Sequence, residues 1–243
     1  MQLAQIWRHP IKGIGAEALD ATTLSENMPL PMDRAWAFLE EGQTDTGAWQ
    51  ACRNFLRGAK APGLMAIEAT LTGDRIDLRH PDRGPISIDP ATDGAQLAEW
   101  LGDIWPAERP APGALIKAPE QGMSDIPFPS ISILSLSSLH AVSAAAGVAL
   151  DPRRFRGNLW LDGADPWAEP QWIGKRLAVG GAVLEIVEPI GRCRATEANP
   201  ETGHRDVAML SLLKELTGDT KFGVYAKVIQ AGEIAAGDPV AVL

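Results

Sequence analysis

The chain has 243 residues, of which 45% are hydrophobic, and a formal net charge of -9 at pH 7. Its length allows one large domain or two small ones, and its apolar content allows a sizeable core and argues against disorder. Because proteins that bind nucleic acids or anionic membranes are usually basic, we expect neither partner. The sequence has no signal-peptide pattern and no run of about 18 apolar residues, so a cytoplasmic location is expected.

Short strands separated by turns are predicted along the first half of the chain. They cover residues 1–7, 35–40, 64–71, 75–79, 86–88 and 115–117. Thr72-Gly73-Asp74 is typical of a hairpin turn between two of these strands. Apolar residues at helical spacing predict a helix over residues 94–101. Residues 49–60 are ambiguous, although Arg53, Arg57 and Lys60 have a spacing that a helix would allow.

The second half combines strands with two helices. The predicted strands cover residues 131–134, 158–162, 176–179, 182–187, 224–229 and 239–243. Ser135 is a typical N-cap for a helix that runs to about Ala146, and Gly147 would end it. An amphipathic pattern predicts a further helix over residues 207–217. Turns or breaks are predicted at residues 122–129, 180–181, 189–191 and 232–238.

These elements indicate a mostly β, α+β fold or a β-barrel, because many short strands occur with at least three helices and without βαβ alternation. The turn-rich segment near Gly122 is the predicted boundary, which divides the chain into residues 1–121 and 122–243.

The chain has 2 cysteines, too few for a disulfide framework, a zinc knuckle or a four-cysteine iron–sulfur cluster.

Cations gather around one of the cysteines. Arg192 and Arg194 flank Cys193, and a neighbouring guanidinium group lowers the pKa of a thiol below its usual value of about 8.5. On a regular strand both arginines would point away from the thiol, so the effect requires a loop, which the nearby turn residues favour. The alternative is that the cysteine is a small buried apolar residue, and we expect that role for Cys52.

A second basic cluster precedes a predicted strand. It contains Arg153, Arg154 and Arg156, followed closely by Asn158. Planar guanidinium groups suit phosphate, so an anionic ligand is one interpretation and solvated surface charge is the other. The residues alone therefore indicate a protein with a thiol and an arginine-rich site.

Several motifs, taken in order, are similar to those of the MOSC-domain family, named for the C-terminal domain of molybdenum cofactor sulfurase. The resemblance is to its two-part members with a MOSC N-terminal β-barrel domain, the group that contains the amidoxime-reducing component. It covers nearly the whole chain. The matching stretches are HPIKG (9–13), MDRAW (32–36), RFRGN (154–158), DGADPWAEPQWIGKRLAVGG (162–181), GRCRATEANPETG (191–203), FGVYAKV (222–228) and GEIAAGDPV (232–240).

The resemblance implies a MOSC β-barrel domain with peripheral helices, a smaller N-terminal β-barrel-like domain, and a cofactor cleft shared between them. It implies a molybdenum cofactor, or molybdopterin, whose metal is bound by the thiolate of Cys193, the expected catalytic residue. The residues at the matching positions that would hold the pterin and its phosphate are Lys12, Arg34, Arg156, Asn158, Arg192 and Thr196.

The activity implied is the reduction of small N-hydroxylated compounds, namely hydroxylamines, amidoximes and N-hydroxylated bases. Electrons would come from a separate reductase or a ferredoxin-like protein, because this chain has no cluster cysteines and no flavin fingerprint. The alternative is a non-catalytic carrier of the cofactor or of sulfur that acts with a pyridoxal-phosphate desulfurase. The chain departs from the family motifs at Gly13, Gly157, Gly191, Glu197 and Asn199, which bears on substrate choice more than on cofactor binding.

Overall fold

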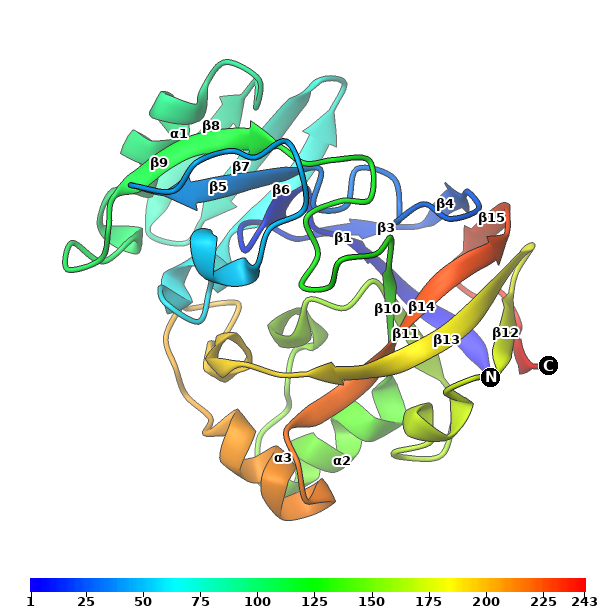
Figure 1. The fold of residues 1–243 in the computed structure, drawn as a ribbon. Helices are drawn as coiled ribbons and strands as arrows, with labels where there is room; N and C mark the ends of the chain where they lie inside the picture. The colour runs from blue at the N-terminus through cyan, green and yellow to red at the C-terminus, as the bar shows by residue number, and fades with distance from the viewer.

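The largest element of the computed structural model, which describes residues 1–243, is an eight-stranded sheet (Figure 1). Its pairs are antiparallel except β10 with β11, which the chain joins through a helix, as parallel neighbours require. In spatial order its strands are β16 (Val240–Val242), β12 (Arg176–Val179), β13 (Ala182–Gly191), β14 (Lys221–Gln230), β10 (Ile131–Ser135), β11 (Leu159–Asp162), β1 (Gln2–Arg8) and β3 (Glu17–Leu19).

Three smaller sheets complete the β structure. They are β15 (Gly232–Ala235) with β4 (Ala21–Leu24); β2 (Ile11–Lys12), β5 (Trp36–Glu40) and β9 (Pro112–Lys117); and β6 (Glu68–Thr72), β7 (Arg75–His80) and β8 (Arg83–Ile88). The last two of these sheets lie in the upper part of Figure 1 and surround a second core, which contains Phe38 and Leu78.

The three α-helices lie where the sequence predicts them. They are α1 (Gly94–Leu101), which packs on β8 and β9, and the mutually packed α2 (Leu136–Ala146) and α3 (Met209–Thr217). The hydroxyl of Ser135 accepts hydrogen bonds from the backbone N–H groups of Ser137 and Ser138, and Gly147 ends α2 at a φ of 70°. None of the three helices combines the length and the apolarity needed to cross a membrane.

The prediction of a mostly β fold with helices is confirmed, but the sheets are open and no closed barrel forms. The two ends of the large sheet meet at an isolated bridge between Gln2 and Pro239, and the Val240 N–H donates to the Met1 carbonyl at 2.9 Å. This contact does not extend into a ladder along β1, because residues Ile6–Arg8 on the same edge of β1 are already paired with β3.

Three local predictions are wrong. Pro62 starts a 3-10 helix (Pro62–Ala66) where a strand was expected, so β6 begins only at Glu68. The predicted break at 189–191 lies within β13, which accommodates Pro189 at a register shift. The predicted turn over 232–238 contains β15, whose partner β4 lies at the other end of the chain.

Several of the first thirty residues pack with the second half of the chain. Leu3, Ile6, Leu24 and Leu30 belong to the core beneath the large sheet, together with residues of β10 to β14. The chain then leaves this sheet to form the smaller sheets and returns at β10. The path brings β2 and the loop before β5 against the C-terminal half, and the boundary after residue 121 stays a prediction.

Candidate functional site

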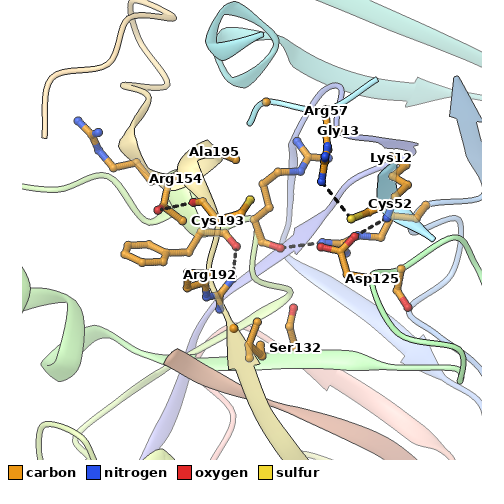
Figure 2. Close-up of a pocket in the computed structure, with 18 of the residues that line it drawn as sticks. Lys12, Gly13, Cys52, Arg57, Asp125, Ser132, Arg154, Arg192, Cys193 and Ala195 are labelled. Atoms are coloured by element: carbon orange, nitrogen blue, oxygen red, sulfur yellow. Dashed lines mark hydrogen bonds and ion pairs between the residues drawn. The ribbon is translucent and has the colours of Figure 1, made fainter. Parts of the chain in front are cut away.

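A cavity of about 310 Å³ is lined by residues from both halves of the chain (Figure 2). Such a volume lies at the lower end of the range for small-molecule sites, roughly 300–1,000 Å³. The structure brings together in its wall every residue for which the sequence predicts a role in the site: Lys12, Arg34, Arg156, Asn158, Arg192, Cys193 and Thr196.

Cys193 lies in a loop between the end of β13 and the 3-10 turn Arg194–Glu197. Its side chain is exposed and lines the cavity. The backbone is extended, and Thr196 donates to the Cys193 carbonyl from both its N–H, at 3.2 Å, and its hydroxyl, at 3.0 Å. Thr196 therefore fixes the backbone that carries the thiol.

The flanking arginines do not activate this thiol. Burial in the cavity wall raises the pKa of Cys193, and the Ala195 N–H and the charges of Arg192 and Arg57 offset this only in part. Arg194 points instead to the Glu197 carboxylate, at 2.8 Å. The expectation of a lowered thiol pKa is therefore wrong, because desolvation outweighs the nearby cations.

Arg192 is a half-buried cation whose side chain donates only to backbone carbonyl oxygens. Its Nε donates to the carbonyl of Phe222 and its Nη1 to that of Phe155, both at 2.8 Å. The guanidinium carbon lies 5.5 Å from the centre of the Phe155 ring. Burial lowers the pKa of Arg192 to about 10, and its hydrogen-bond partners are backbone carbonyls rather than carboxylates.

Arg156 is held in the same way from the other side. It follows the 3-10 helix Pro152–Phe155 with a left-handed φ of 48°, and it donates to the Gly15 carbonyl at 2.9 Å and the Ile11 carbonyl at 3.3 Å. Burial, and then the charge of Arg34, lower its pKa to about 9. Arg156 thus joins the two halves, and its side chain donates to carbonyls rather than to a carboxylate.

The remaining predicted cations have carboxylate partners. Lys12 pairs with Asp125 and also donates to the Met123 carbonyl at 3.0 Å. Arg34 pairs with Asp33 and donates to the Arg156 carbonyl at 2.8 Å. Burial alone would raise the pKa of Asp125, but the charges of Lys12 and the nearby guanidinium groups outweigh burial, so the pKa lies below its usual value. This carboxylate is therefore charged at neutral pH.

Asn158 connects strands. Its Oδ1 accepts from the N–H of Ser132, at 3.1 Å, and from the hydroxyl of the same residue, at 2.8 Å. Its Nδ2 donates to the Trp7 carbonyl at 3.1 Å. The side chain is buried, and these bonds link β10 and β1 beside the cavity.

Arg57, Asp125 and Tyr225 are among the lining residues to which sequence reasoning gave no role in the site. Arg57 lies in the ambiguous segment 49–60, and Asp125 lies in the turn-rich segment 122–129 that predicts the boundary. Tyr225 is the only tyrosine of the chain and faces the cavity from β14. Burial, together with Asp125, raises its pKa to about 12.

Each half of the chain matches the model of a known protein family. The MOSC N-terminal beta barrel domain matches residues 1–107, and the MOSC domain matches residues 127–241. The chain belongs to the MOSC family.

Relatives of this MOSC protein include Mitochondrial amidoxime-reducing component 1 of Homo sapiens, 23% identical over 99% of this chain and 82% of the relative. Molybdenum cofactor sulfurase of Danio rerio is 32% identical over 30% of this chain and 9% of its own length. Among solved structures, the YUAD protein of Bacillus subtilis has a TM-score of 0.48 and 12% identity, covering 98% of this chain and 93% of that one.

The glycines at which this MOSC protein departs from the family motifs differ in their surroundings. A Cβ on Gly13, whose φ is 76°, would lie 2.6 Å from the Leu56 carbonyl oxygen, and one on Gly157 would lie 2.2 Å from Leu134 Cδ1. A Cβ on Gly191 would meet nothing within 4 Å. The first two glycines are therefore required by packing, whereas Gly191 leaves open space at the cavity wall.

The other two departures lie outside the cavity lining. The Glu197 carboxylate points to Arg194 and Arg205, so it adds no anion to the cavity. Asn199 accepts from the N–H of Glu201 at 2.9 Å and so stabilises the turn.

Proposed function

We propose that this chain is a molybdenum-cofactor-dependent oxidoreductase that reduces N-hydroxylated compounds. The observation that carries the proposal is the shared cavity, in which an exposed thiol lies with the half-buried guanidinium groups of Arg156 and Arg192, which donate to backbone carbonyls and not to carboxylates. Similarity to proteins named as amidoxime-reducing components, over nearly the whole chain, supports the substrate class.

The donors in the cavity suit an anionic ligand that contains a soft metal. Cys193 would bind the metal through its Sγ, because molybdenum accepts thiolate ligands. Arg156 and Arg192, with Lys12 and Arg34, would hold the phosphate and the pterin through hydrogen bonds and positive potential. When bound, the cofactor supplies two-electron transfer, and the protein binds and orients the reactants.

Asn158 and Thr196 would act by position. Asn158 holds β1 to β10, whose Ser132 lines the cavity, and Thr196 holds the Cys193 backbone. Both have their polar atoms committed to protein partners. In this proposal they support the cofactor-binding residues.

The reaction breaks the N–O bond of the substrate. A hydroxylamine takes up two electrons and two protons to give the amine and water, and an amidoxime gives the amidine and water. The electrons come from a separate reductase or ferredoxin-like protein. At neutral pH the Tyr225 hydroxyl stays protonated and can donate at the cavity wall, whereas the Asp125 carboxylate can accept.

Turnover tests the proposal. Protein made in a host that synthesises the cofactor should reduce benzamidoxime with an artificial electron donor. Cys193→Ala should lose at least about a hundredfold in kcat/KM, because the metal loses its thiolate ligand. Arg194→Gln is the control, since Arg194 is exposed and points away to Glu197. No turnover by the cofactor-loaded wild type, or equal activity in Cys193→Ala, would contradict the proposal.

A second candidate is a carrier that holds the cofactor or a persulfide on Cys193 and passes it to another protein. The local similarity to molybdenum cofactor sulfurase favours it. In such a protein a separate pyridoxal-phosphate desulfurase would supply the sulfur. A carrier would bind the cofactor and release it to an acceptor without reducing benzamidoxime.

A further inference from the structure

Arg57 is the least satisfied cation of the cavity wall. Figure 2 shows its guanidinium group directed at Cys52, to whose Sγ the Nη1 donates at 3.2 Å. The Nε of Arg57 is buried and has no hydrogen-bond partner. A guanidinium group offers several N–H donors, and a thiol is only a weak acceptor. Most of the N–H groups of Arg57 therefore remain available to donate hydrogen bonds to a ligand in the cavity.

The other cations of the wall are better partnered. Lys12, Arg34 and Arg154 pair with Asp125, Asp33 and Asp206 respectively. Arg156 and Arg192 each donate to backbone carbonyls. Arg57 has neither a carboxylate nor a carbonyl partner. A buried N–H group without an acceptor, such as the Nε of Arg57, is costly unless a ligand accepts from it.

Arg57 lies close enough to the thiol for its charge to lower the pKa of Cys193, although burial outweighs this effect. A Cβ added to Gly58 would lie 3.3 Å from the Ala195 Cβ, so this segment packs directly against the turn that follows Cys193. Arg57 comes from the irregular segment before the 3-10 helix Pro62–Ala66, on the N-terminal side of the cavity. The thiol and the guanidinium group therefore face a common space.

We propose that Arg57 is a specificity-determining residue that binds an oxyanion, a carboxylate or phosphate, carried by the N-hydroxylated substrate. This inference rests on the proposed function and narrows its substrates to anionic compounds. The guanidinium group suits such an oxyanion because its planar N–H groups can donate two parallel hydrogen bonds. An anionic substrate also agrees with the cationic lining of the cavity.

A matched pair of substrates tests this inference. Benzamidoxime and 4-carboxybenzamidoxime differ only in a carboxylate. The wild type should have the higher kcat/KM for the carboxylated compound, and Arg57→Gln should reduce the ratio of the two kcat/KM values by about tenfold or more, the effect of a hydrogen bond to a charged group. Arg57→Lys should restore part of the ratio. Arg53→Gln, an exposed residue of the same segment outside the cavity, should leave it unchanged.

A measurement without turnover separates this inference from the proposed function. In calorimetry on the purified full chain, 4-carboxybenzamide should bind more tightly than benzamide. Arg57→Gln should reduce the ratio of the two affinities by about tenfold. If neither amidoxime is reduced, the proposed function fails and the calorimetry still decides the role of Arg57. Equal affinities in the wild type, or an unchanged preference in Arg57→Gln, would overturn the inference. So would a loss of molybdenum from Arg57→Gln, since Arg57 would then bind the cofactor.

Discussion

At the scale of single residues, Cys193 combines an exposed side chain with a cavity that disfavours its charged form. Desolvation raises the pKa of the thiol more strongly than Arg192 and Arg57 lower it. Binding of a metal must therefore displace a proton from the sulfur. Metal binding at this residue is expected to strengthen as the pH rises toward the pKa of the thiol.

Alkylation of the cofactor-free protein measures this property. In a Cys52→Ser background, the rate at which iodoacetamide modifies Cys193 should still be rising above about pH 9, because the reactive thiolate forms late. Cys52→Ser with Cys193→Ala provides the background rate. A rate that levels off below about pH 8 would instead indicate a thiol activated by its arginine neighbours.

Gly157 and Gly191 form a matched pair for packing at the cavity. Gly157→Ala should lower the free energy of unfolding by about 1–3 kcal/mol, because the new Cβ would overlap Leu134. Gly191→Ala should change it by less than about 0.5 kcal/mol, since the space around Gly191 is open. Urea denaturation of both variants checks this, and equal losses would count against the described packing.

At the scale of elements, hydrogen bonds from side chains join strands that are far apart in the sequence. Asn158 contacts both Trp7 in β1 and Ser132 in β10. Arg156 reaches the carbonyls of Ile11 and Gly15. The RFRGN motif therefore holds the first and second halves of the chain together as well as lining the cavity.

Replacement of Asn158 by alanine should destabilise the protein even without cofactor. The Trp7 carbonyl and the Ser132 N–H would be left buried without their partner, which costs about 2 kcal/mol or more in the free energy of unfolding. Asn199→Ala, in an exposed turn, should cost clearly less. Unchanged stability of Asn158→Ala would show that this residue does not hold the strands together.

The helices were predictable from local chemistry, whereas several strands were not. The N-cap Ser135 and the terminal Gly147 mark α2 within a few neighbouring residues. By contrast, β4 and β15 are short, and each is a strand only because the other pairs with it from the opposite end of the chain. No local pattern reports such a partner.

At the scale of the whole molecule, buried ionisable groups behind the cavity couple stability to pH. His9 follows β1, and its backbone N–H donates to Asp33 at 2.7 Å. Burial, and then the charges of Arg156 and Arg34, lower the pKa of His9 to about 3. Between about pH 6.5 and pH 3 the unfolded chain therefore binds a proton at His9 that the folded chain does not.

The free energy of unfolding should accordingly fall as the pH drops below about 6.5, by up to about 1.4 kcal/mol per pH unit from this residue. Urea denaturation at pH 7.5 and pH 5 measures the loss. His9→Gln should lose less between these values than the wild type, whereas His204→Gln, at an exposed position, should lose as much. Identical losses in all three proteins would contradict this role of His9.

The site could be predicted in part because its motifs carry its main cations and its thiol. Lys12, Arg34, Arg156, Arg192 and Cys193 come from distant motifs and line one cavity. Arg57 and Asp125 lie in segments without a recognisable pattern, and only the folded chain brings them to the same wall. The raised pKa of Cys193 was also beyond sequence reasoning, because it depends on how much of the surrounding water the fold excludes.

The metal content of the protein tests the central claim most directly. Purified from a host that makes the cofactor, the wild type should contain molybdenum at close to one atom per chain by elemental analysis, and Cys193→Ala should contain much less. Arg194→Gln should match the wild type, because its side chain points away from the cavity. A wild type without molybdenum, or a Cys193→Ala variant that retains it fully, would contradict the assignment of Cys193 as the metal ligand.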